Sequence, residues 1–274
     1  MIIESGKLRG MDAFADFKAA QKAGWKHFAP LQTVTTPAAA RLVRHARIVP
    51  ASRVLDVACG TGVVAITAAR LGARATGLDL TPELLETARS NAVTAAVEID
   101  WHEGDVEKLP FESGTFDAVV SQFGHMFAPR PDVATGEMLR VLKPGGTIAF
   151  TTWPPELFMG RRLALIGRHM PPPPGAAPPP LWGDPNIIRE RLGTAVRDIV
   201  FARDKICAPA LSVQHFREMT ERTAGSVLKL VESLISADPA KLAAIRRELD
   251  ALATQYFEDN VVSQDYLMTR AVKL

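Results

Sequence analysis

The amino-acid sequence predicts an α/β fold, in which a doubly wound parallel sheet carries helices on both faces. Short apolar runs, first at 54–58 and again at 75–80, alternate with segments of helical pattern, and this order joins parallel strands through helices. The runs are largely continuous rather than alternating in polarity, as expected of parallel strands that are buried on both faces. The first run leads into Gly60-Thr61-Gly62, a glycine-rich connection from a strand to a helix.

The central part of the chain supplies most strands of this sheet. A helix is expected over 63–71, directly after the glycine-rich turn. Thr81 and Pro82 provide an N-cap and a first helical residue for a second helix, which continues to about residue 95. A third helix near 133–142 should end at Lys143-Pro144-Gly145-Gly146. Further strands are predicted at 99–102, 116–121 and 147–152.

Residues 1–50 are predicted to be mostly helical and to form an N-terminal cap. Their aromatic residues recur at spacings that suit one face of a helix. Two interpretations stay open, a helix packed on the main domain and a cap over the active site. The aromatic residues are Phe14, Phe17, Trp25 and Phe28.

Residues 154–194 interrupt the alternation of strands and helices and are predicted to form an inserted lid. The proline-rich stretch 171–180 excludes a regular helix or a central strand, so it is a loop on the lid, a stiff connector, or a docking site for a proline-binding partner. The apolar stretch 157–166 contains the basic pair Arg161-Arg162. It is interpreted as a helix packed on the sheet, as a lid over a hydrophobic acceptor, or as a helix that contacts a membrane surface.

The rest of the chain, 195–274, is predicted to complete the sheet. Strands at 195–206 and 264–272 would pair in antiparallel fashion at the sheet edge, with helices over 212–234 and 239–257 between them. Together with a cofactor-binding core at 51–153, this divides the chain into four parts. The division is 1–50, 51–153, 154–194 and 195–274.

Composition excludes several classes of protein. The chain has 274 residues with 47% hydrophobic residues, enough for one substantial core, and a formal net charge of +2, which gives no general attraction to nucleic acid. Two cysteines, Cys59 and Cys207, do not make a disulfide framework or a zinc site. Residues 1–10 lack the apolar core of a signal peptide, and no apolar run reaches the roughly 20 residues of a membrane span. We expect a cytoplasmic protein without stable membrane insertion.

The glycine-rich turn indicates an adenosine-containing ligand. Residues 60–65 fit the pattern G-x-G-x-x-A, in which glycines allow the backbone to approach a ligand closely. Asp79 follows at the end of the second strand, where a carboxylate accepts hydrogen bonds from the two hydroxyls of a ribose. NAD and S-adenosylmethionine (SAM) both satisfy these two features.

Three further features favour SAM over NAD. Asp56 precedes the glycine-rich turn, and a carboxylate there suits the ammonium group of SAM but repels a pyrophosphate. Asp105 follows the third strand, where it would accept from the adenine amino group, while Val106 and Leu80 enclose the ring. The glycine pattern also begins only after some fifty residues, whereas dinucleotide domains often open with it.

The motifs and their order resemble those of class I SAM-dependent methyltransferases. Residues 54–62 resemble the glycine-rich motif of that family, and residues 104–111 resemble the adenine-site segment of its ubiquinone and menaquinone methyltransferases. Residues 116–121 and 139–147 match later motifs, so the resemblance covers about 50–152. It implies a Rossmann-like sheet of about seven strands with the last strand antiparallel, and SAM as the cofactor.

The resemblance also implies a role for each motif residue. Gly60, Thr61 and Gly62 would hold the methionine part of SAM through backbone atoms, and Gln122, after the fourth strand, would face the sulfonium. The alternatives are that Asp56 orders the loop and that Asp105 forms an ordinary turn. The predicted cofactor-binding residues are Asp56, Ala58, Gly60, Thr61, Gly62, Asp79, Leu80, Asp105, Val106 and Gln122.

The predicted reaction is metal-independent, in-line transfer of a methyl group to a small-molecule acceptor. A general base is needed only if the acceptor must lose a proton, and His125 in the loop after the fourth strand is the first candidate, with His27 and His169 weaker. A histidine that only packs the loop is the competing interpretation of His125. Neither the Pro-Pro-aromatic motif of amino-methylating nucleic-acid enzymes nor a Pro-Cys nucleophile follows the fourth strand.

Two other functions stay open at this point. A protein that binds SAM without catalysis would carry the same glycines and the same acid at Asp79. An NAD-dependent oxidoreductase is a weaker alternative, because the sequence lacks a recognisable Tyr-x-x-x-Lys or acid–histidine pair. The sequence names neither the acceptor nor an oligomeric state, because substrate contacts in this fold come from the caps.

Overall fold

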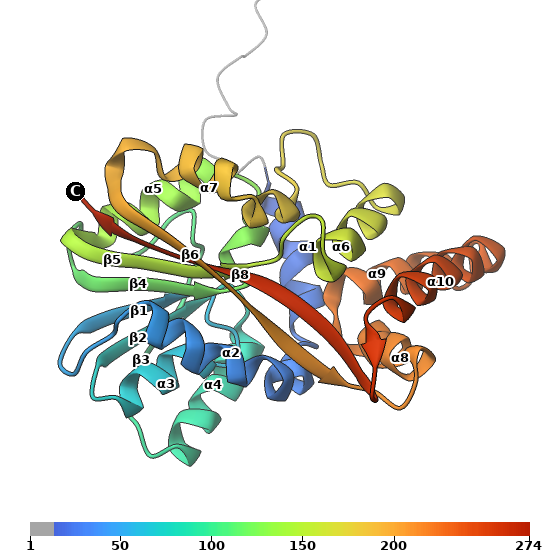
Figure 1. Cartoon of the computed structure of the whole chain (residues 1–274), viewed down its shortest axis with the longest axis horizontal. Helices are drawn as coiled ribbons and strands as arrows, with labels where there is room; N and C mark the ends of the chain where they lie inside the picture. Colours follow the sequence, from blue (N-terminus) through green and yellow to red (C-terminus); the bar gives the residue numbers. More distant parts are fainter. Residues whose placement is uncertain (1–13) are drawn as a thin grey trace, which may run out of the picture.

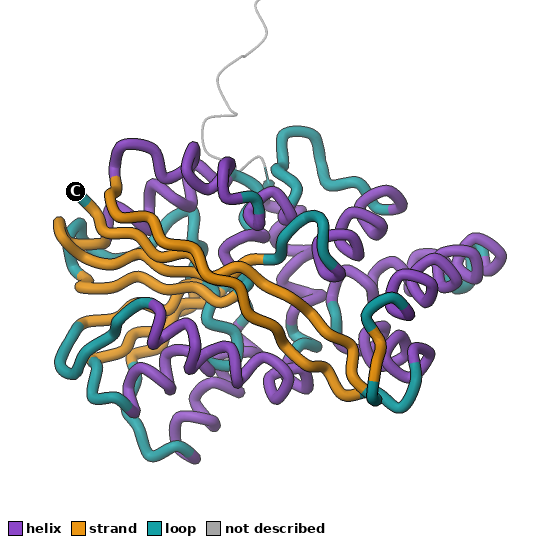
Figure 2. Tube along the Cα trace, in the orientation of Figure 1, coloured by secondary structure: helices purple, strands orange, loops and turns teal. Residues whose placement is uncertain are grey.

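A computed structural model describes residues 14–274, and its centre is one mixed sheet (Figures 1 and 2). The strand order is β3-β2-β1-β4-β5-β8-β6, with the two-residue strand β7 paired to β8. The predicted cap therefore lies only partly within the described residues. The strands are β1 Arg53–Val57, β2 Arg74–Asp79, β3 Asp100–Glu103, β4 Phe116–Gln122, β5 Leu142–Thr152, β6 Val196–Pro209, β7 Phe257–Glu258 and β8 Val261–Lys273.

The helices follow the predicted alternation through the core and then gather beyond one end of the sheet. In Figure 1, α2, α3 and α4 lie below the sheet and α5 and α7 above it, while α6, α8, α9 and α10 group at the right. The helices are α1 Ala15–Trp25, α2 Gln32–His45, α3 Val63–Arg70, α4 Pro82–Thr94, α5 Pro131–Val141, α6 Phe158–His169, α7 Pro185–Leu192, α8 Val213–Thr223, α9 Gly225–Leu234 and α10 Pro239–Thr254.

Strand pairing confirms the doubly wound topology. β1 pairs in parallel with β2 on one side and with β4 on the other, so the order of the sheet reverses at β1. Ligands bind at such a reversal in open α/β sheets, outside the carboxyl ends of the strands. β8 is antiparallel to both β5 and β6, which confirms the predicted antiparallel strand late in the chain.

Each face of the sheet buries its own apolar cluster. Leu55, Val119 and Phe150 pack on the side of α5 and α7, whereas Val54 and Val120 pack against α2 and α3. Neighbouring residues of β1 and β4 thus point to opposite faces, and both faces are covered. This explains why these strands read as continuous apolar runs.

The structure differs from the prediction in the helices after residue 180. The expected single helix over 212–234 is two helices, α8 and α9, because Ala224 has an extended backbone and the helix restarts at Gly225. Helix α7 was not predicted. It begins after Asp184, whose side chain accepts from the backbone N–H of Asn186, a local N-cap signal that the preceding prolines obscured. The stretch 171–180 is a loop up to the short 3-10 helix at Pro179–Gly183.

Strands β6 and β8 continue as a two-stranded ribbon past the rest of the sheet. β8 pairs with β5 only from Leu267 to Val272, but it pairs with β6 as far as Val261 opposite Pro209. The ribbon leads into α8 at one end and returns from α10, and it carries these helices away from the sheet (Figures 1 and 2). These helices are therefore attached to the last two long strands.

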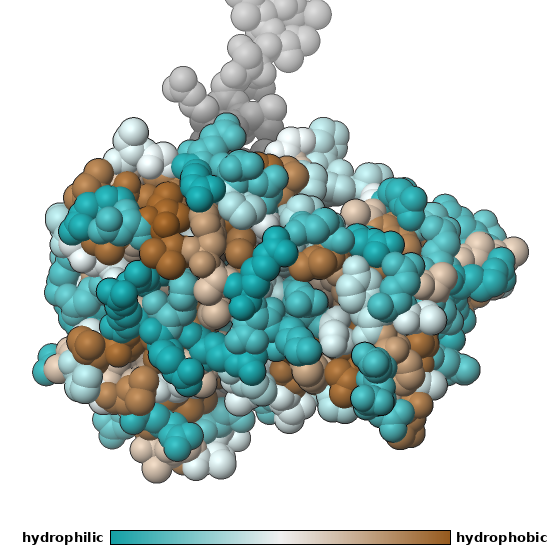
Figure 3. Space-filling view, in the orientation of Figure 1, coloured by the Kyte–Doolittle hydropathy of each residue, from teal (hydrophilic) through white to brown (hydrophobic). Residues whose placement is uncertain are grey.

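The outer strand β6 carries charged side chains, as edge strands that avoid pairing with other chains usually do. Arg197, Arg203 and Lys205 are exposed on it, and hydrophilic residues run across the middle of the space-filling view (Figure 3). Charged side chains on an edge strand oppose pairing with another chain. Among residues 14–274, no helix has both the length and the hydrophobicity that crossing a membrane would require.

Candidate active site

A cavity of about 220 Å³ opens where the parallel strands end. It lies at the reversal of strand order between β1 and β4, as the topology predicts. Five of its lining residues come directly after β1, β2, β3, β4 and β5. These residues are Ala58, Leu80, Gly104, Phe123 and Trp153.

The opposite side of the cavity is an apolar chamber formed by helices. α1 contributes Trp25, α6 contributes Met159 and Leu163, and α8 contributes Phe216 and Met219. A chamber of this kind binds an apolar ligand and keeps water away from it. Helix α1 of the predicted cap and helix α6 of the predicted lid thus line the same cavity.

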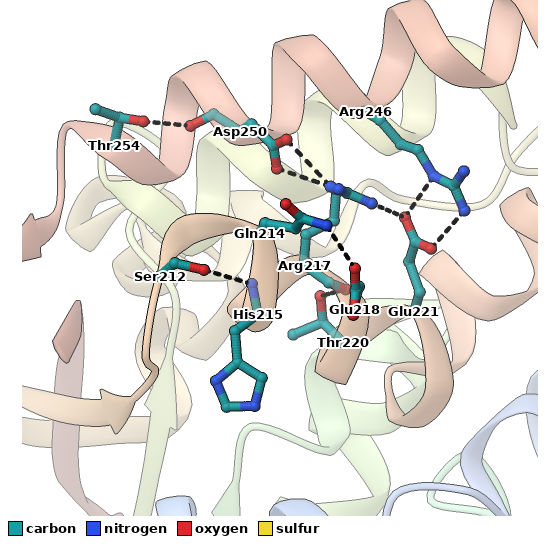
Figure 4. Close-up of polar contacts among 10 residues, drawn as sticks. All are labelled: Ser212, Gln214, His215, Arg217, Glu218, Thr220, Glu221, Arg246, Asp250 and Thr254. Carbon is teal, nitrogen blue, oxygen red and sulfur yellow. Dashed lines mark hydrogen bonds and ion pairs between the residues drawn. The ribbon is translucent and has the colours of Figure 1, made fainter. Parts of the chain in front are cut away.

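Helix α8 is fixed on the chamber by ion pairs to α10. The Nε of Arg217 donates to both oxygens of Asp250, at 2.9 and 3.1 Å, and Arg246 donates to both oxygens of Glu221, at 2.9 and 2.7 Å (Figure 4). Arg217 also donates to Glu221 through Nη1 at 3.2 Å. The two negative charges of the acids match the two positive charges of the arginines. The network therefore holds the chamber wall in place with no net charge.

Asp79 is buried at the end of β2 and fixes the turn after β1. One carboxylate oxygen accepts from the backbone N–H of Gly60 at 2.8 Å and the other accepts from the N–H of Thr81 at 2.8 Å. Burial raises the pKa of Asp79, and the N–H groups of Thr81 and Gly60 oppose that rise. The carboxylate lines the cavity with lone pairs still available for a diol.

Asp56 lies inside β1 and is 1% exposed. Its Oδ2 accepts from the N–H of Ala65 in the first turn of α3 at 3.0 Å, and within residues 14–274 its Oδ1 has no hydrogen-bond partner. Burial raises the pKa of Asp56 to about 8, and the nearby Asp79 adds to the rise. An unsatisfied buried carboxylate oxygen on a cavity wall indicates a cationic ligand group.

The two glycines of the turn have different surroundings. A Cβ on Gly60, whose φ is +55°, would have no heavy atom within 4 Å and would project into open space at the cavity. A Cβ on Gly62, whose φ is +80°, would lie 2.5 Å from the ring of Trp101 and 3.1 Å from Ala88. Gly60 therefore gives a ligand access to the backbone, and Gly62 permits close packing of α3.

Asp105 is held in place by α1. Its Oδ1 accepts from the N–H of Glu107 at 2.9 Å, and its Oδ2 lies 2.7 Å from the ammonium group of Lys18, which also pairs with Glu107 at 2.6 Å. Lys18 and Asp105 both line the cavity. Helix α1 is thus tied electrostatically to the segment that was predicted to bind adenine.

Gln122 ends β4 and lies between α2 and the cavity. Its Nε2 donates to the backbone carbonyl of Thr35 at 3.0 Å, and its buried Oε1 has no partner in the part of the chain that is described. Ala58 and Phe123, on the same wall, both have positive φ values, 52° and 58°. Such strained non-glycine residues concentrate at functional sites.

The cavity brings together every predicted cofactor residue except Gly62, which packs against Trp101 instead. Because the backbone N–H of Gly62 donates to the carbonyl of Cys59 at 2.9 Å, it serves the turn itself. The residues that do line the cavity are Asp56, Ala58, Gly60, Thr61, Asp79, Leu80, Asp105, Val106 and Gln122.

Comparison with known proteins shows the family. Residues 55–150 match the protein family described as "Methyltransferase domain". The fold is similar to that of a candidate methyltransferase from Bacillus halodurans C-125, with a TM-score of 0.59 and 20% identity over 86% of this chain and 98% of the other. The chain belongs to the class I SAM-dependent methyltransferases.

The relatives cover different shares of this methyltransferase. An uncharacterized protein of Mycobacterium tuberculosis is 36% identical over 245 residues, which cover 88% of this chain and 89% of the relative. A ubiquinone biosynthesis O-methyltransferase of Xanthomonas campestris pv. campestris is 40% identical, but only over 38% of this chain and 44% of its own length. A Haemonchus contortus phosphoethanolamine N-methyltransferase solved with SAM shares the fold, with a TM-score of 0.56 and 17% identity, over 96% of this chain and 60% of the other.

The cavity of the methyltransferase fits SAM on two observations. The unsatisfied Oδ1 of Asp56 would provide an acceptor for the ammonium group of the methionine part. The open space at Gly60 is a cradle that any larger side chain would fill. The first turn of α3, next to both, presents a helix N-terminus, which favours the carboxylate of the same part.

Binding of SAM to the methyltransferase at pH 7 is expected to release close to one proton. Asp56 with a pKa of about 8 is mostly protonated in the ligand-free protein, and the ammonium group of SAM favours its ionised form. Isothermal titration calorimetry in two buffers with different ionisation enthalpies measures the proton release. Asp56→Asn should bind SAM about 10- to 100-fold more weakly and release no proton. Equal proton release by both proteins would contradict this assignment.

The position of His125 does not support the predicted role as a general base. Its ring is 0% exposed and packs between Phe150 and Trp182, with centroid distances of 4.7 and 4.6 Å, and it does not line the cavity. Burial, together with the charge of Arg191, lowers the pKa of His125 to about 3. His27 is exposed and His169 half-buried, and neither lines the cavity. The loop-packing interpretation agrees with this position.

Replacing His125 with phenylalanine is expected to leave turnover within about twofold and to change the pH dependence of stability. The folded pKa lies below the unfolded value, so His125 favours folding above pH 6.5 and this contribution is lost as the pH falls toward 3. The loss is about 1.4 kcal/mol per pH unit in that range. Thermal unfolding between pH 5 and 8 should therefore be flatter for His125→Phe. A large loss of turnover in a folded variant would restore the catalytic role.

Several residues of the site were not predicted. The backbone N–H of Thr81 donates to Asp79 and holds its carboxylate in place. Lys18, on a helix that is distant in sequence, forms an ion pair with Asp105. Lys18 has no local signal. Arg162 lies in the cavity wall, and its spacing from Phe158 and Leu165 on one face of α6 was a signal that could have placed it.

Proposed function

We propose that this methyltransferase transfers the methyl group of SAM to a small molecule whose apolar body occupies the chamber under α1, α6 and α8. One observation carries the proposal. A single cavity extends from the carboxylates of Asp56 and Asp79 to the apolar side chains of Leu163 and Phe216. A cofactor and an acceptor bound at its two ends would therefore meet inside one enclosed space.

The cofactor end would be held by residues at the ends of β1, β2 and β3. Asp79 would accept from the ribose hydroxyls, Asp56 would pair with the ammonium group, and Asp105 would accept from the adenine amino group. Bound SAM supplies an electrophilic methyl group on a sulfonium. The task of these residues is to fix its direction relative to the acceptor.

The acceptor end would act by orientation and by exclusion of water. Trp25 and Phe28 close one side of the chamber, and Met159 and Met219 provide flexible side chains that adapt to the acceptor. Because His125 is enclosed in the core, the proposal includes no protein base. An acceptor that is nucleophilic without losing a proton to a side chain fits this arrangement.

Incubation with SAM labelled in its methyl group and a panel of apolar acceptors tests the proposal. We expect a labelled product from at least one acceptor. Leu163→Trp, which fills the chamber, should raise the KM for that acceptor at least tenfold and leave SAM binding within about twofold. Leu71→Trp, at an exposed position 51% accessible, is the matched control. SAM binding without transfer to any acceptor would favour the non-catalytic alternative.

A further inference from the structure

Arg162 is a buried cation in the wall of the apolar chamber. The residue is 6% exposed, and it lies on the face of α6 that packs inward with Phe158 and Leu165. Its Nη1 makes only a weak contact with the sulfur of Met159 at 3.8 Å, and its Nη2 has no hydrogen-bond partner among residues 14–274. A guanidinium with five N–H donors is normally paired when it is buried.

The acids near Arg162 are already matched by other arginines. Asp250 accepts twice from Arg217, and Glu221 accepts from both Arg217 and Arg246 (Figure 4). Arg162 and Asp250 both line a void of about 10 Å³, which is room for at most one water molecule. Burial lowers the pKa of Arg162 to about 10, with no neighbouring carboxylate that raises it. The charge of Arg162 is therefore left without a counter-ion from the described chain.

Two neighbours of the guanidinium, Phe216 and Met159, face the chamber. The guanidinium carbon lies 5.7 Å from the centre of the Phe216 ring, and both Phe216 and Met159 line the cavity. An aromatic ring compensates a desolvated cation only in part, because burying an unpaired charge costs more than a cation–π contact returns. The missing partner is therefore an anion that enters the chamber with the acceptor.

One charge in an apolar chamber selects one opposite charge. A doubly charged phosphate would leave a net negative charge buried, whereas a carboxylate is neutralised completely. The two oxygens of a carboxylate also match the two terminal nitrogens of a guanidinium. We propose that Arg162 binds the carboxylate of an apolar monocarboxylic acid, and that the methyl acceptor belongs to this class. The assignment of the acceptor rests on the proposed function, whereas the carboxylate site itself does not.

Binding of simple monocarboxylates tests this site without turnover. Decanoate and 3-phenylpropanoate, each compared with its primary amide, would be titrated into protein saturated with the demethylated cofactor. We expect at least one carboxylate to bind 10-fold or more tightly than its amide. Arg162→Met should remove that preference, and Arg161→Met should keep it, because Arg161 is an exposed neighbour that contacts Gln255.

Three results would overturn or separate the proposals. Equal binding of carboxylates and amides, or equal effects of Arg161→Met and Arg162→Met, would overturn the site. Thermal unfolding checks folding, and because Arg162→Met removes an uncompensated buried charge we expect its Tm to be no lower than that of the wild type. If Arg162→Met fails to fold, Arg162→Lys should retain a weaker preference for carboxylates. Labelled methyl transfer to neutral acceptors, unchanged in Arg162→Met, would keep the proposed function and refute the acceptor class.

Discussion

Replacement of Asp79 with alanine is expected to weaken SAM binding by about 100- to 1,000-fold. The variant lacks the carboxylate that is proposed to accept from the ribose hydroxyls. Hydrogen bonds to a charged group contribute about 1.5–3 kcal/mol each. The N–H groups of Gly60 and Thr81, which donate to this carboxylate at 2.8 Å, would also lose their acceptor, so the turn that is proposed to receive the methionine part would lose its fixed shape. Calorimetric titration with SAM and with its demethylated product measures the effect.

Two comparisons make the Asp79 result specific. Asp79→Asn keeps one acceptor and the volume of the side chain, so we expect an intermediate loss of affinity. Glu103→Gln changes an exposed acid at the end of the neighbouring strand β3 and should leave affinity within about twofold. Retention of wild-type affinity by a folded Asp79→Ala protein would refute the ribose assignment. Tight binding of NAD by the wild type would contradict the assignment of SAM as the cofactor.

Replacing each glycine of the turn with alanine is expected to affect a different property, stability for Gly62 and SAM affinity for Gly60. Gly62→Ala should destabilise the protein by roughly 2–4 kcal/mol, because the φ of +80° disfavours a Cβ and the new atom would lie 2.5 Å from Trp101. Gly60→Ala should cost only the backbone strain, about 1–2 kcal/mol, but its Cβ enters the cavity and should lower SAM affinity more than tenfold.

Thermal unfolding and SAM titration of both glycine variants separate packing from ligand contact. Gly114→Ala, with φ of +65° and no heavy atom within 4 Å of the added Cβ, controls for backbone strain away from the cavity. If Gly62→Ala is as stable as Gly114→Ala, the packing against Trp101 is not the constraint. If Gly60→Ala binds SAM as the wild type does, the backbone at this position does not approach the ligand.

The grouping of the predicted cofactor residues around one cavity was predictable because its signals are local. Each predicted residue lies in a short apolar run or shortly after one, and the ends of parallel strands meet at one edge of a sheet. Asp56, Asp79 and Asp105 are therefore brought together by strand order alone, and the cavity contains all three. Gly62 followed the same sequence pattern but serves helix packing, a distinction that needs the position of Trp101.

The acceptor end was not predictable, because it depends on how distant helices pack. His125 occurs in the expected loop, yet the backbone reverses at Phe123, with φ of +58°, and the N–H of His125 donates to Ser121 Oγ at 3.2 Å. The loop thereby turns the imidazole into the core instead of the cavity. Arg162 and Lys18 acquire their roles only when α6 and α1 are placed over the strand ends. Sequence spacing alone does not state which helix covers which strand.

The insertion of β8 between β5 and β6 has a consequence for the order of assembly. Within residues 14–274, β6 does not pair with β5 and joins the sheet through β8, which is made after α8, α9 and α10. The pairing of β8 with β5 joins residues far apart in sequence, such as Thr147 and Val272, and closing such long loops slows folding. The half that carries Asp56 and Asp79 has all its strand partners early in synthesis, whereas the chamber wall waits for β8. A growing chain would therefore complete the proposed cofactor site first and close the proposed acceptor chamber last, so that the two sites form at different times.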